Sequence, residues 1–285
     1  MRAFLILLLL TTGAAPGAAQ QESVEDSHLP KSKYNLFHRT PVALRRPLAT
    51  DRPDRTESPY TVDAGLFQAE IDLFTYGGDD EEGTESNTFR VLPFNIKAGL
   101  THRIDLQFVL ETWAWNEETA GGGTQRQRGI GAITVRTKVN MWGNDGGRTA
   151  FALMPFVAFV SDPGQSSRVV NVGLVMPFRV DIGAGWGLST MLEFDLAAET
   201  ADSPRKVAAI GSASIGRTIV GPLSFYAEVY GGTVLADESS DWEGTGDLGL
   251  TLGIGSNVQL DVGLNLGVTR LAEDVNPFLG LAFRF

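Results

Sequence analysis

The chain has 285 residues, a formal net charge of −11 at pH 7 and no cysteine. The missing cysteines exclude disulfide bonds, thiolate metal sites and a cysteine nucleophile. So acidic a chain also excludes nucleic acid as a partner. Beyond the N-terminus no stretch approaches the roughly 18 apolar residues of a transmembrane helix. A membrane β-barrel remains open, because its strands alternate lipid-facing and inward-facing residues.

The first residues, MRAFLILLLLTTGAAPGAAQ, have the composition of an export signal. Arg2 precedes an apolar run over residues 3–10, and small residues follow up to Ala19. This run is too short for a transmembrane helix, which needs about 20 residues, but it is typical of a signal peptide. We therefore expect residues 1–19 to be a signal peptide that is cleaved before Gln20.

Residues 20–60 differ from the rest of the chain. They hold five of the thirteen prolines and mixed charges without a sustained period, which predicts an irregular segment on the periplasmic side. One hypothesis is that this segment folds into the barrel as a plug. Its arginines would then meet carboxylates on the wall: Arg45, Arg46, Arg52 and Arg55.

From residue 61 onward, apolar and polar residues alternate with a period of two. In VQLDVGLNLGVTR the apolar residues Val258, Leu260 and Val262 occupy every second position. Such runs exceed the strands of globular proteins, about 5–6 residues, and match the about 9–11 residues of a strand that crosses a bilayer. The twelve predicted strands are residues 61–76, 89–101, 104–116, 129–142, 148–160, 169–181, 187–199, 206–219, 223–235, 245–255, 258–270 and 276–285.

The connections between these strands also alternate. THR, GNDGG, IGAGW, VGP and SN follow the even-numbered strands, whereas longer or more polar stretches follow the odd-numbered ones. Bacterial outer-membrane barrels have short periplasmic turns and longer outer loops. The sequence thus predicts an all-β fold: a single transmembrane antiparallel β-barrel of about 12 strands, of the outer-membrane type, over residues 61–285. We expect it in the outer membrane of a Gram-negative bacterium, with both termini periplasmic.

The chain ends in a strand, NPFLGLAFRF, that stops on Phe285. In a closed barrel this strand pairs with the first, so that no edge is left exposed, and its large apolar residues face lipid. A C-terminal strand of this kind resembles the signal read by the barrel-assembly machinery. We expect that machinery as a partner, beside the lipid bilayer and lipopolysaccharide.

Four prolines, each followed by phenylalanine, interrupt the predicted strands. Proline cannot donate a hydrogen bond to the ladder and is normally confined to edges, strand starts or bulges. We expect local bulges at Pro93, Pro155, Pro177 and Pro277, and the strand register near them is left open.

Several segments together carry a family resemblance: VRTKVNMWGNDGG (residues 135–147), GLTHRIDLQ (99–107), GPLSFYAEVY (221–230) and LNLGVTRLAEDVNPFLGLAFRF (264–285). They resemble the outer-membrane transporters grouped as the MetA-pathway of phenol degradation family, over about residues 60–285. The resemblance implies an outer-membrane channel, and the family's name suggests uptake of aromatic compounds. It supplies no catalytic motif.

The inward face of the predicted barrel is rich in charge. Asp105 and Glu111 on one strand stand beside Arg136 and Lys138 on the next, which suggests a constriction whose field orients a polar solute. The alternative is a set of structural salt bridges that fill a narrow lumen. The candidate permeation residues are Asp105, Glu111, Arg136, Lys138, Arg179, Glu193, Asp195, Tyr226, Glu228 and Tyr230.

Aromatic residues near the outer mouth allow two interpretations. By parity Trp113, Trp115, Tyr226 and Tyr230 point inward, with Phe74 near the outer rim, and would form a slide for aromatic solutes. If the register is shifted by one residue, the tryptophans instead belong to the aromatic girdle that faces lipid.

Two outer loops are acidic, DDEEGTE (residues 79–85) and DESSDWE (237–243). Oxygen ligands suit Ca²⁺ or Mg²⁺, so these loops could bind cations that bridge lipopolysaccharide, but neither has the regular spacing of a calcium loop. We favour solvated loops, and the sequence predicts no metal site and no cofactor.

Histidines are scarce and badly placed for an enzyme. A serine hydrolase needs a histidine beside its nucleophile, but His28 and His38 lie in the N-terminal segment and His102 in a predicted turn. The sequence therefore predicts a channel for passive uptake of small molecules and no enzyme. The alternative is a structural or adhesion barrel with a blocked lumen; an outer-membrane hydrolase is less favoured.

Overall fold

The computed structural model describes residues 31–81, 83–121, 123–161, 168–198, 203–235 and 242–285. The predicted signal peptide, residues 1–19, lies outside these ranges. Residues 31–285 form one compact unit, in which two 3-10 helices, η1 (Lys31–Lys33) and η2 (Val42–Leu44), precede the strands. No helix of the described residues is long and apolar enough to cross a membrane.

The strands are β1 (Phe67–Glu81), β2 (Thr84–Val91), β3 (Phe94–Gly99), β4 (Ile104–Leu110), β5 (Trp113–Ala120), β6 (Gly123–Ile130), β7 (Ile133–Trp142), β8 (Thr149–Ser161), β9 (Arg168–Gly183), β10 (Trp186–Ala197), β11 (Lys206–Val220), β12 (Leu223–Leu235), β13 (Glu243–Ile254), β14 (Val258–Gly267) and β15 (Val275–Arg284).

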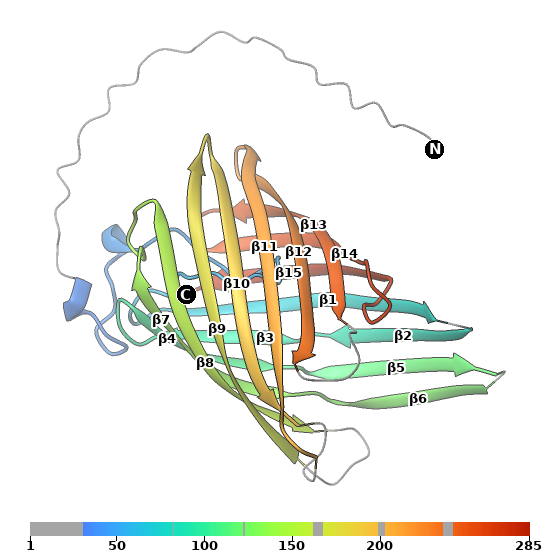
Figure 1. Ribbon diagram of the computed structural model, residues 1–285. Coiled ribbons are helices and arrows are strands. Elements are labelled where there is room, and N and C mark those ends of the chain that lie inside the picture. Colours follow the sequence, from blue (N-terminus) through green and yellow to red (C-terminus); the bar gives the residue numbers. More distant parts are fainter. Residues whose placement is uncertain (1–30, 82, 122, 162–167, 199–202, 236–241) are drawn as a thin grey trace, which may run out of the picture. The chain divides into compact units, whose positions relative to one another are not determined.

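Twelve of these strands close into a barrel. Their order is β1, β3, β4 and then β7 to β15, and β15 pairs back onto β1 in antiparallel register. Figure 1 shows these strands around a common interior. The predicted all-β, twelve-stranded, closed antiparallel barrel of the outer-membrane type is confirmed.

The last strand shows why the sequence closes in this way. Along β15 buried and more exposed residues alternate without interruption, so that Phe278 and Arg284 point inward while Leu279 points outward and is 42% exposed. At the closure the Phe285 ring stacks on Phe67, with 5.9 Å between centroids. An apolar outer face and a polar inner face are what a strand between lipid and a polar lumen requires.

Three of the predicted strands are interrupted in the structure. β2 and β3, β4 and β5, and β6 and β7 are each consecutive halves of one strand, and β1 has a bulge between Asp72 and Phe74. The breaks adjoin one another across the sheet, because Phe94 pairs with both Ile71 and Leu110, and Leu110 pairs with Ile133. Each break adds residues to the strand, so side chains beyond this line exchange faces.

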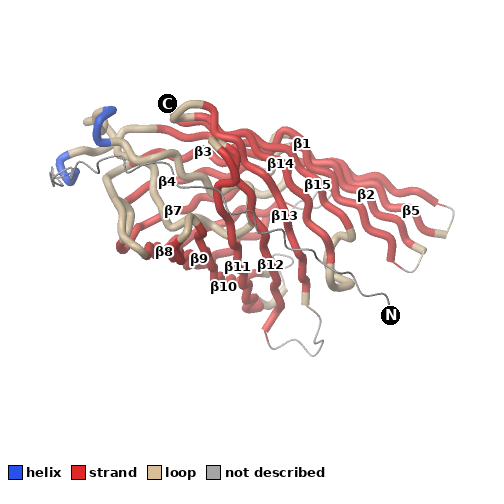
Figure 2. Tube along the Cα trace, turned by 90° about the horizontal axis from the view of Figure 1, so that it is seen from above, coloured by secondary structure: helices blue, strands red, loops and turns tan. Residues whose placement is uncertain are grey.

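Beyond the breaks the strands continue further than predicted. The ends of β1, β2, β5 and β6 run on as a sheet away from the barrel (Figure 2). The polar stretches expected as loops over residues 77–88 and 116–128 are therefore hairpins, since strands outside a bilayer tolerate polar residues on both faces. The acidic stretch at residues 79–85 lies mainly in the β1–β2 hairpin, whereas most of residues 237–243 lies outside the described ranges.

The four prolines give a mixed outcome. Pro93 stands at the β2–β3 break, next to Leu92 with φ of 55°. The bulges expected at Pro155, Pro177 and Pro277 are wrong, because each of these residues pairs in register with one neighbouring strand. An antiparallel residue donates its N–H to one neighbour only, so proline interrupts a single ladder and the strand runs on.

The breaks also reverse the predicted direction of the outer tryptophans. Phe74 of β1 pairs with Leu279, which points outward from β15. Tyr76, two residues further along β1, therefore shares this outer face. Tyr76 pairs with Phe89, and Phe89 pairs with Trp115. Trp113 shares this face and is 51% exposed. The inward placement of these aromatic residues is therefore wrong, and the register shifted by one residue is the correct interpretation.

Candidate functional site

The barrel interior is occupied by part of the chain's own N-terminus. Residues 46–63, called the luminal segment here, contact inward-facing side chains of β1, β3, β4, β7, β10, β11, β12, β14 and β15. The segment enters at the end of the barrel where the short turns lie, since Asn144 of the β7–β8 turn accepts a hydrogen bond from the Thr61 backbone at 3.1 Å.

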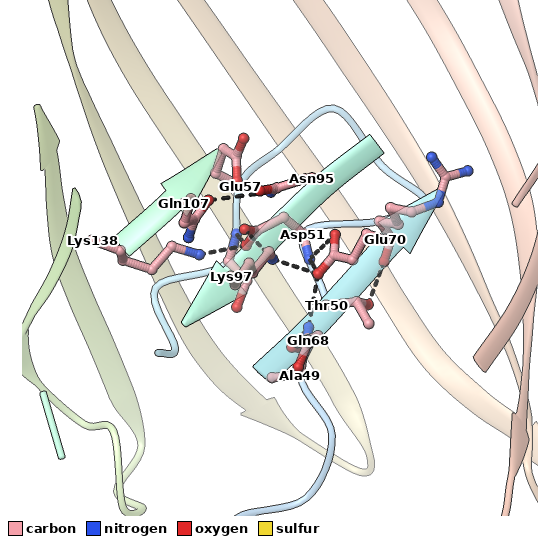
Figure 3. A network of polar contacts seen from close by, with 12 residues as sticks. Ala49, Thr50, Asp51, Glu57, Gln68, Glu70, Asn95, Lys97, Gln107 and Lys138 are labelled. Atoms are coloured by element: carbon pink, nitrogen blue, oxygen red, sulfur yellow. Dashed lines mark hydrogen bonds and ion pairs between the residues drawn. The ribbon is translucent and has the colours of Figure 1, made fainter. Parts of the chain in front are cut away.

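Asp51 is a buried anchor of the luminal segment. Its carboxylate lies 2.5 Å from Lys97 Nζ of β3 and 2.5 Å from Lys138 Nζ of β7. Glu70 of β1 pairs with the same Lys97 and accepts the Asp51 backbone N–H at 3.2 Å. Figure 3 shows the carboxylates and lysines converging from the segment and three strands. The lysine side chains are 2% and 0% exposed, so this cluster is closed to solvent.

The cluster holds Asp51 in its charged form. Burial alone would raise the pKa of this carboxyl, but the attraction of Lys138, Lys97 and Arg136 outweighs burial and holds the pKa well below its usual range. Removal of the carboxylate would therefore leave two buried ammonium groups without their partner, which is among the more costly changes in a folded protein.

Arg52 is the second anchor and contacts the adjoining part of the wall, formed by β1, β14 and β15. Its guanidinium pairs with Asp72 of β1 and, at 2.8 Å, with Asp261 of β14. A niche in β15 receives it, because a side chain on Gly280 would place Cβ 2.0 Å from the guanidinium. The ring of Phe278 lies 5.8 Å away. The guanidinium can therefore occupy this niche only because residue 280 is a glycine.

A third group of contacts joins the segment to β12 and β7. Glu228 accepts the backbone N–H groups of Arg55 and Thr56 at 2.8 and 2.7 Å. The Arg55 guanidinium lies 3.5 Å from the centre of the Tyr230 ring. Glu57 pairs with Arg136 of β7.

A cavity of about 660 Å³ remains between the luminal segment and the wall. On the wall side it is lined mainly by residues of β9 to β12, with Thr251 of β13 and Gln259 of β14. Arg179 donates to Ser189 Oγ at 3.1 Å, and the buried Tyr226 hydroxyl has no hydrogen-bond partner among the described residues. The residues used below are Tyr60, Arg179, Ser189, Ser214, Gly216 and Tyr226.

The structure brings most of the predicted permeation residues to the luminal segment. Asp105 accepts the Val62 backbone N–H at 2.9 Å and pairs in register with Lys138. Glu193 and Asp195 stand side by side on β10, and the charge of Glu57 acts on Glu193. Those that contact the segment or line the cavity are Asp105, Arg136, Lys138, Arg179, Tyr226, Glu228 and Tyr230.

Glu111 is an exception. The sequence places it opposite Arg136 and Lys138, but its carboxylate is exposed and accepts the Ala132 backbone N–H at 3.1 Å. Glu111 lies at the β4–β5 break and Ala132 at the β6–β7 break, and the Glu111 backbone N–H donates to the Ala132 carbonyl at 3.0 Å. The facing arrangement predicted for Glu111 is therefore wrong, because the strand break turns this side chain away.

Sequence reasoning missed Asp51 as a partner of the wall. It anticipated arginines meeting carboxylates, as Arg52 and Arg55 do, but not a carboxylate meeting lysines. The signal present in the sequence is the alternation of acidic and basic residues in TDRPDRTE. Such a segment can pair with both the basic and the acidic side chains of the barrel wall. Gly280 was likewise unnoticed, since a glycine niche is recognisable only once its occupant is known.

Comparisons with known proteins agree with this architecture. An outer membrane channel from Pseudomonas putida F1 superposes with a TM-score of 0.57 at 12% identity, covering 83% of this chain and 100% of that chain. The transport unit of the autotransporter AIDA-I from Escherichia coli gives a TM-score of 0.51 at 10% identity, covering 84% of this chain and 93% of that chain. No curated protein shows significant sequence similarity to the chain.

The closed barrel with an apolar outside and a charged inside defines an outer-membrane β-barrel protein. The profile of the family described as "Putative MetA-pathway of phenol degradation" matches residues 50–285. The chain belongs to this family. The match begins just before Asp51, so it includes the anchors of the luminal segment as well as the barrel.

Proposed function

We propose that the protein is an outer-membrane channel for passive uptake of small molecules, which pass between the luminal segment and the wall formed by β9 to β12. The observation that carries the proposal is the cavity of about 660 Å³ left inside a closed barrel whose lumen is otherwise occupied. Its lining of four arginines, two carboxylates, several hydroxyls and tyrosine rings suits small solutes with a polar group and an apolar body.

Aromatic or hydrophobic compounds are the proposed solutes. The name of the family supports this choice, and so does the lining by Tyr60 and Tyr226, because aromatic rings pack favourably on one another. Their polar groups would meet Arg179 and the hydroxyls of Ser189 and Ser214.

The proposed orientation places both termini in the periplasm. The short turns and Phe285 lie at one end of the barrel, and the longer connections lie at the other, as in bacterial outer-membrane proteins. The C-terminal strand that ends on Phe285 is then available to the barrel-assembly machinery, and the opposite end faces lipopolysaccharide.

We propose no enzymatic activity. His38 packs edge-on against Tyr34, with 5.1 Å between ring centroids. His102 offers its backbone carbonyl to Arg46 and Asn144. Both histidines therefore have contacts at the short-turn end of the barrel, and neither is placed beside the luminal cavity.

Conductance in planar bilayers tests the proposal. Ser214→Phe fills the cavity and should lower the single-channel conductance several-fold, whereas Ala213→Phe, its neighbour on the lipid face, should leave it unchanged. Liposome swelling should then show faster entry of small phenols than of sugars of similar size. A folded wild-type barrel without any conductance would instead favour the structural or adhesion barrel with a blocked lumen.

A further inference from the structure

A second cavity, of about 530 Å³, lies at the periplasmic rim between the start of the luminal segment and the β13–β14 turn. The proposed uptake path uses the first cavity and does not account for this one. Its lining combines arginines from the N-terminal part and from the last strand with a lipid-side residue: Val42, Arg45, Arg46, Asn257, Val258 and Arg284.

Positive charge exceeds negative charge around this rim cavity. Asp63 lies 3.0 Å from Arg46 Nε and 3.8 Å from Arg284 Nη1. Asp145 lies 3.6 Å from Arg46 Nη1 and also pairs with Lys31. The charges of Arg45 and Arg46 both act against that of Arg284. Four cations therefore share two carboxylates: Lys31, Arg45, Arg46 and Arg284 against Asp63 and Asp145.

Two of these arginines also have unused hydrogen-bond donors. The Arg46 side chain is only 9% exposed, and its Nη2 has no hydrogen-bond partner among the described residues. Arg45 donates Nε to the Thr40 carbonyl at 3.3 Å and makes no ion pair within the described residues. A buried guanidinium with an unpaired N–H is costly, and clustered like charges add to that cost. Both costs fall when an oxyanion occupies the cavity.

We propose that the rim cavity is a binding site for a phosphate group, held by Arg45 and Arg46 with Arg284 behind them. The planar forks of two guanidinium groups match the oxygens of a phosphate. The excess of two positive charges balances the charge of a phosphate monoester and exceeds the single charge of a phospholipid phosphodiester. Arg284 keeps its place in the wall, because it donates to Asn257 Oδ1 at 3.0 Å and to the Arg46 carbonyl at 2.9 Å.

Two sources supply such a phosphate: the headgroup of a phospholipid in the periplasmic leaflet, and a free phosphate ester in the periplasm. The cavity borders the lipid surface, because Val258, which lines it, pairs with the outward-facing Phe283. Ile254 beside the turn is 49% exposed. A bound headgroup would contact Arg45 and Arg46 directly, and would thus join the entry of the luminal segment to the membrane.

Titration calorimetry on the full-length, delipidated protein in a non-ionic detergent tests the site. The probes are dihexanoyl phosphatidylglycerol, inorganic phosphate and, as a probe without phosphate, dihexanoylglycerol. Arg45→Gln should weaken binding of the phosphate probes about tenfold, the loss expected for a charge-assisted contact. Arg103→Gln, an exposed arginine of the β3–β4 turn, is the matched control and should bind as the wild type does.

The three probes separate the outcomes. Tighter binding of the phosphatidylglycerol than of inorganic phosphate, with loss in Arg45→Gln, supports the lipid headgroup. Equal binding of both with the same loss supports the free phosphate ester. The proposal is overturned if neither phosphatidylglycerol nor inorganic phosphate binds. It is also overturned if Arg45→Gln binds them as tightly as wild type does, or if dihexanoylglycerol binds as tightly as the phosphatidylglycerol.

Discussion

The two sides of the barrel differ in how closely they contact the luminal segment. On the side of β1, β3, β4 and β7, buried side chains of opposite charge grip the segment, and Lys97 and Lys138 are almost without exposure. On the side of β9 to β12 the segment faces a cavity, where Arg179 has one hydroxyl partner. The comparison teaches that the segment is an insert whose buried ion pairs lie mainly on one wall. Along part of the other wall, where Glu228 of β12 also holds it, the segment leaves a cavity.

The size of the inward-facing residues explains this difference. Long charged residues on β3 and β7 reach across to the segment, whereas β10 and β11 present Gly187, Ser189, Ser214 and Gly216. Arg179 itself lies over Gly187, since a Cβ there would stand 2.1 Å from the guanidinium. Small residues on one wall and long residues on the other therefore displace the free space to one side.

Asp51→Ala should have the largest effect, because it removes the partner of two buried lysines. Breaking a buried ion pair in this way costs about 3–5 kcal/mol, so the segment should leave its seat. We expect a several-fold rise in single-channel conductance and rapid trypsin cleavage after Arg55, because the bond after Arg52 precedes a proline and resists trypsin. Asp181→Ala is the control, because it removes an exposed carboxylate at the end of β9, and it should leave both readouts near wild type. Equal conductance of wild type and Asp51→Ala would contradict the anchoring role.

Gly280→Ala should loosen the second anchor. The added Cβ would lie 2.0 Å from the Arg52 guanidinium, which must then leave its niche between Asp72 and Asp261. We expect partial release, seen as trypsin cleavage slower than in Asp51→Ala but faster than in wild type. Gly253→Ala is the matched control, because its nearest heavy atom would be 3.8 Å away. If both variants resist trypsin equally, Gly280 has no role in seating the segment.

Arg179→Gln changes the cavity wall and leaves the anchors intact. Loss of this positive charge should shift the reversal potential in a salt gradient toward cation selectivity, without trypsin sensitivity. Arg126→Gln is the control, since Arg126 is an exposed residue of the β5–β6 hairpin that pairs with Glu117 at 2.8 Å and does not line the cavity. An unchanged reversal potential in Arg179→Gln would mean that ions do not pass along this wall.

Acidification should tighten the seat of the segment to a smaller extent. Burial raises the pKa of Glu57 to about 7 and that of Asp54 to about 6. A carboxyl whose pKa is raised in the seated state binds its proton more tightly in that state than in the released one. Protonation of Glu57 therefore favours the seated segment, fully so below the ordinary pKa of 4.5. This contribution is lost as the pH rises through about 7.

Trypsin would be inactive over part of that range, so conductance is the measurement. It should fall modestly between about pH 8 and about pH 5, and Glu57→Gln should reduce this change. A conductance that rises on acidification, in wild type and Glu57→Gln alike, would contradict this prediction.

Alternation in the sequence was enough to predict the barrel, because a period of two decides which face each residue takes. It failed where a strand is interrupted without an obvious signal: neither Glu111–Thr112 nor Gly131–Ala132 contains a proline, and the extra residues there reverse Trp113 and Trp115. The seat of the segment was out of reach for another reason. Asp51 meets Lys97 and Lys138 across long stretches of chain, and only the closed barrel brings them together.

The passage on the cavity side is tested most directly by single cysteines, because the chain has none of its own. Ser214 lines the cavity and Asn95 does not; Asn95 lies on the anchored wall, where it donates to Gln107 Oε1 at 3.2 Å. Each variant is treated with a charged methanethiosulfonate during single-channel recording. A passage beside the segment predicts a stepwise loss of current for Ser214→Cys and none for Asn95→Cys. Loss of current for Asn95→Cys with an unaffected Ser214→Cys would contradict it.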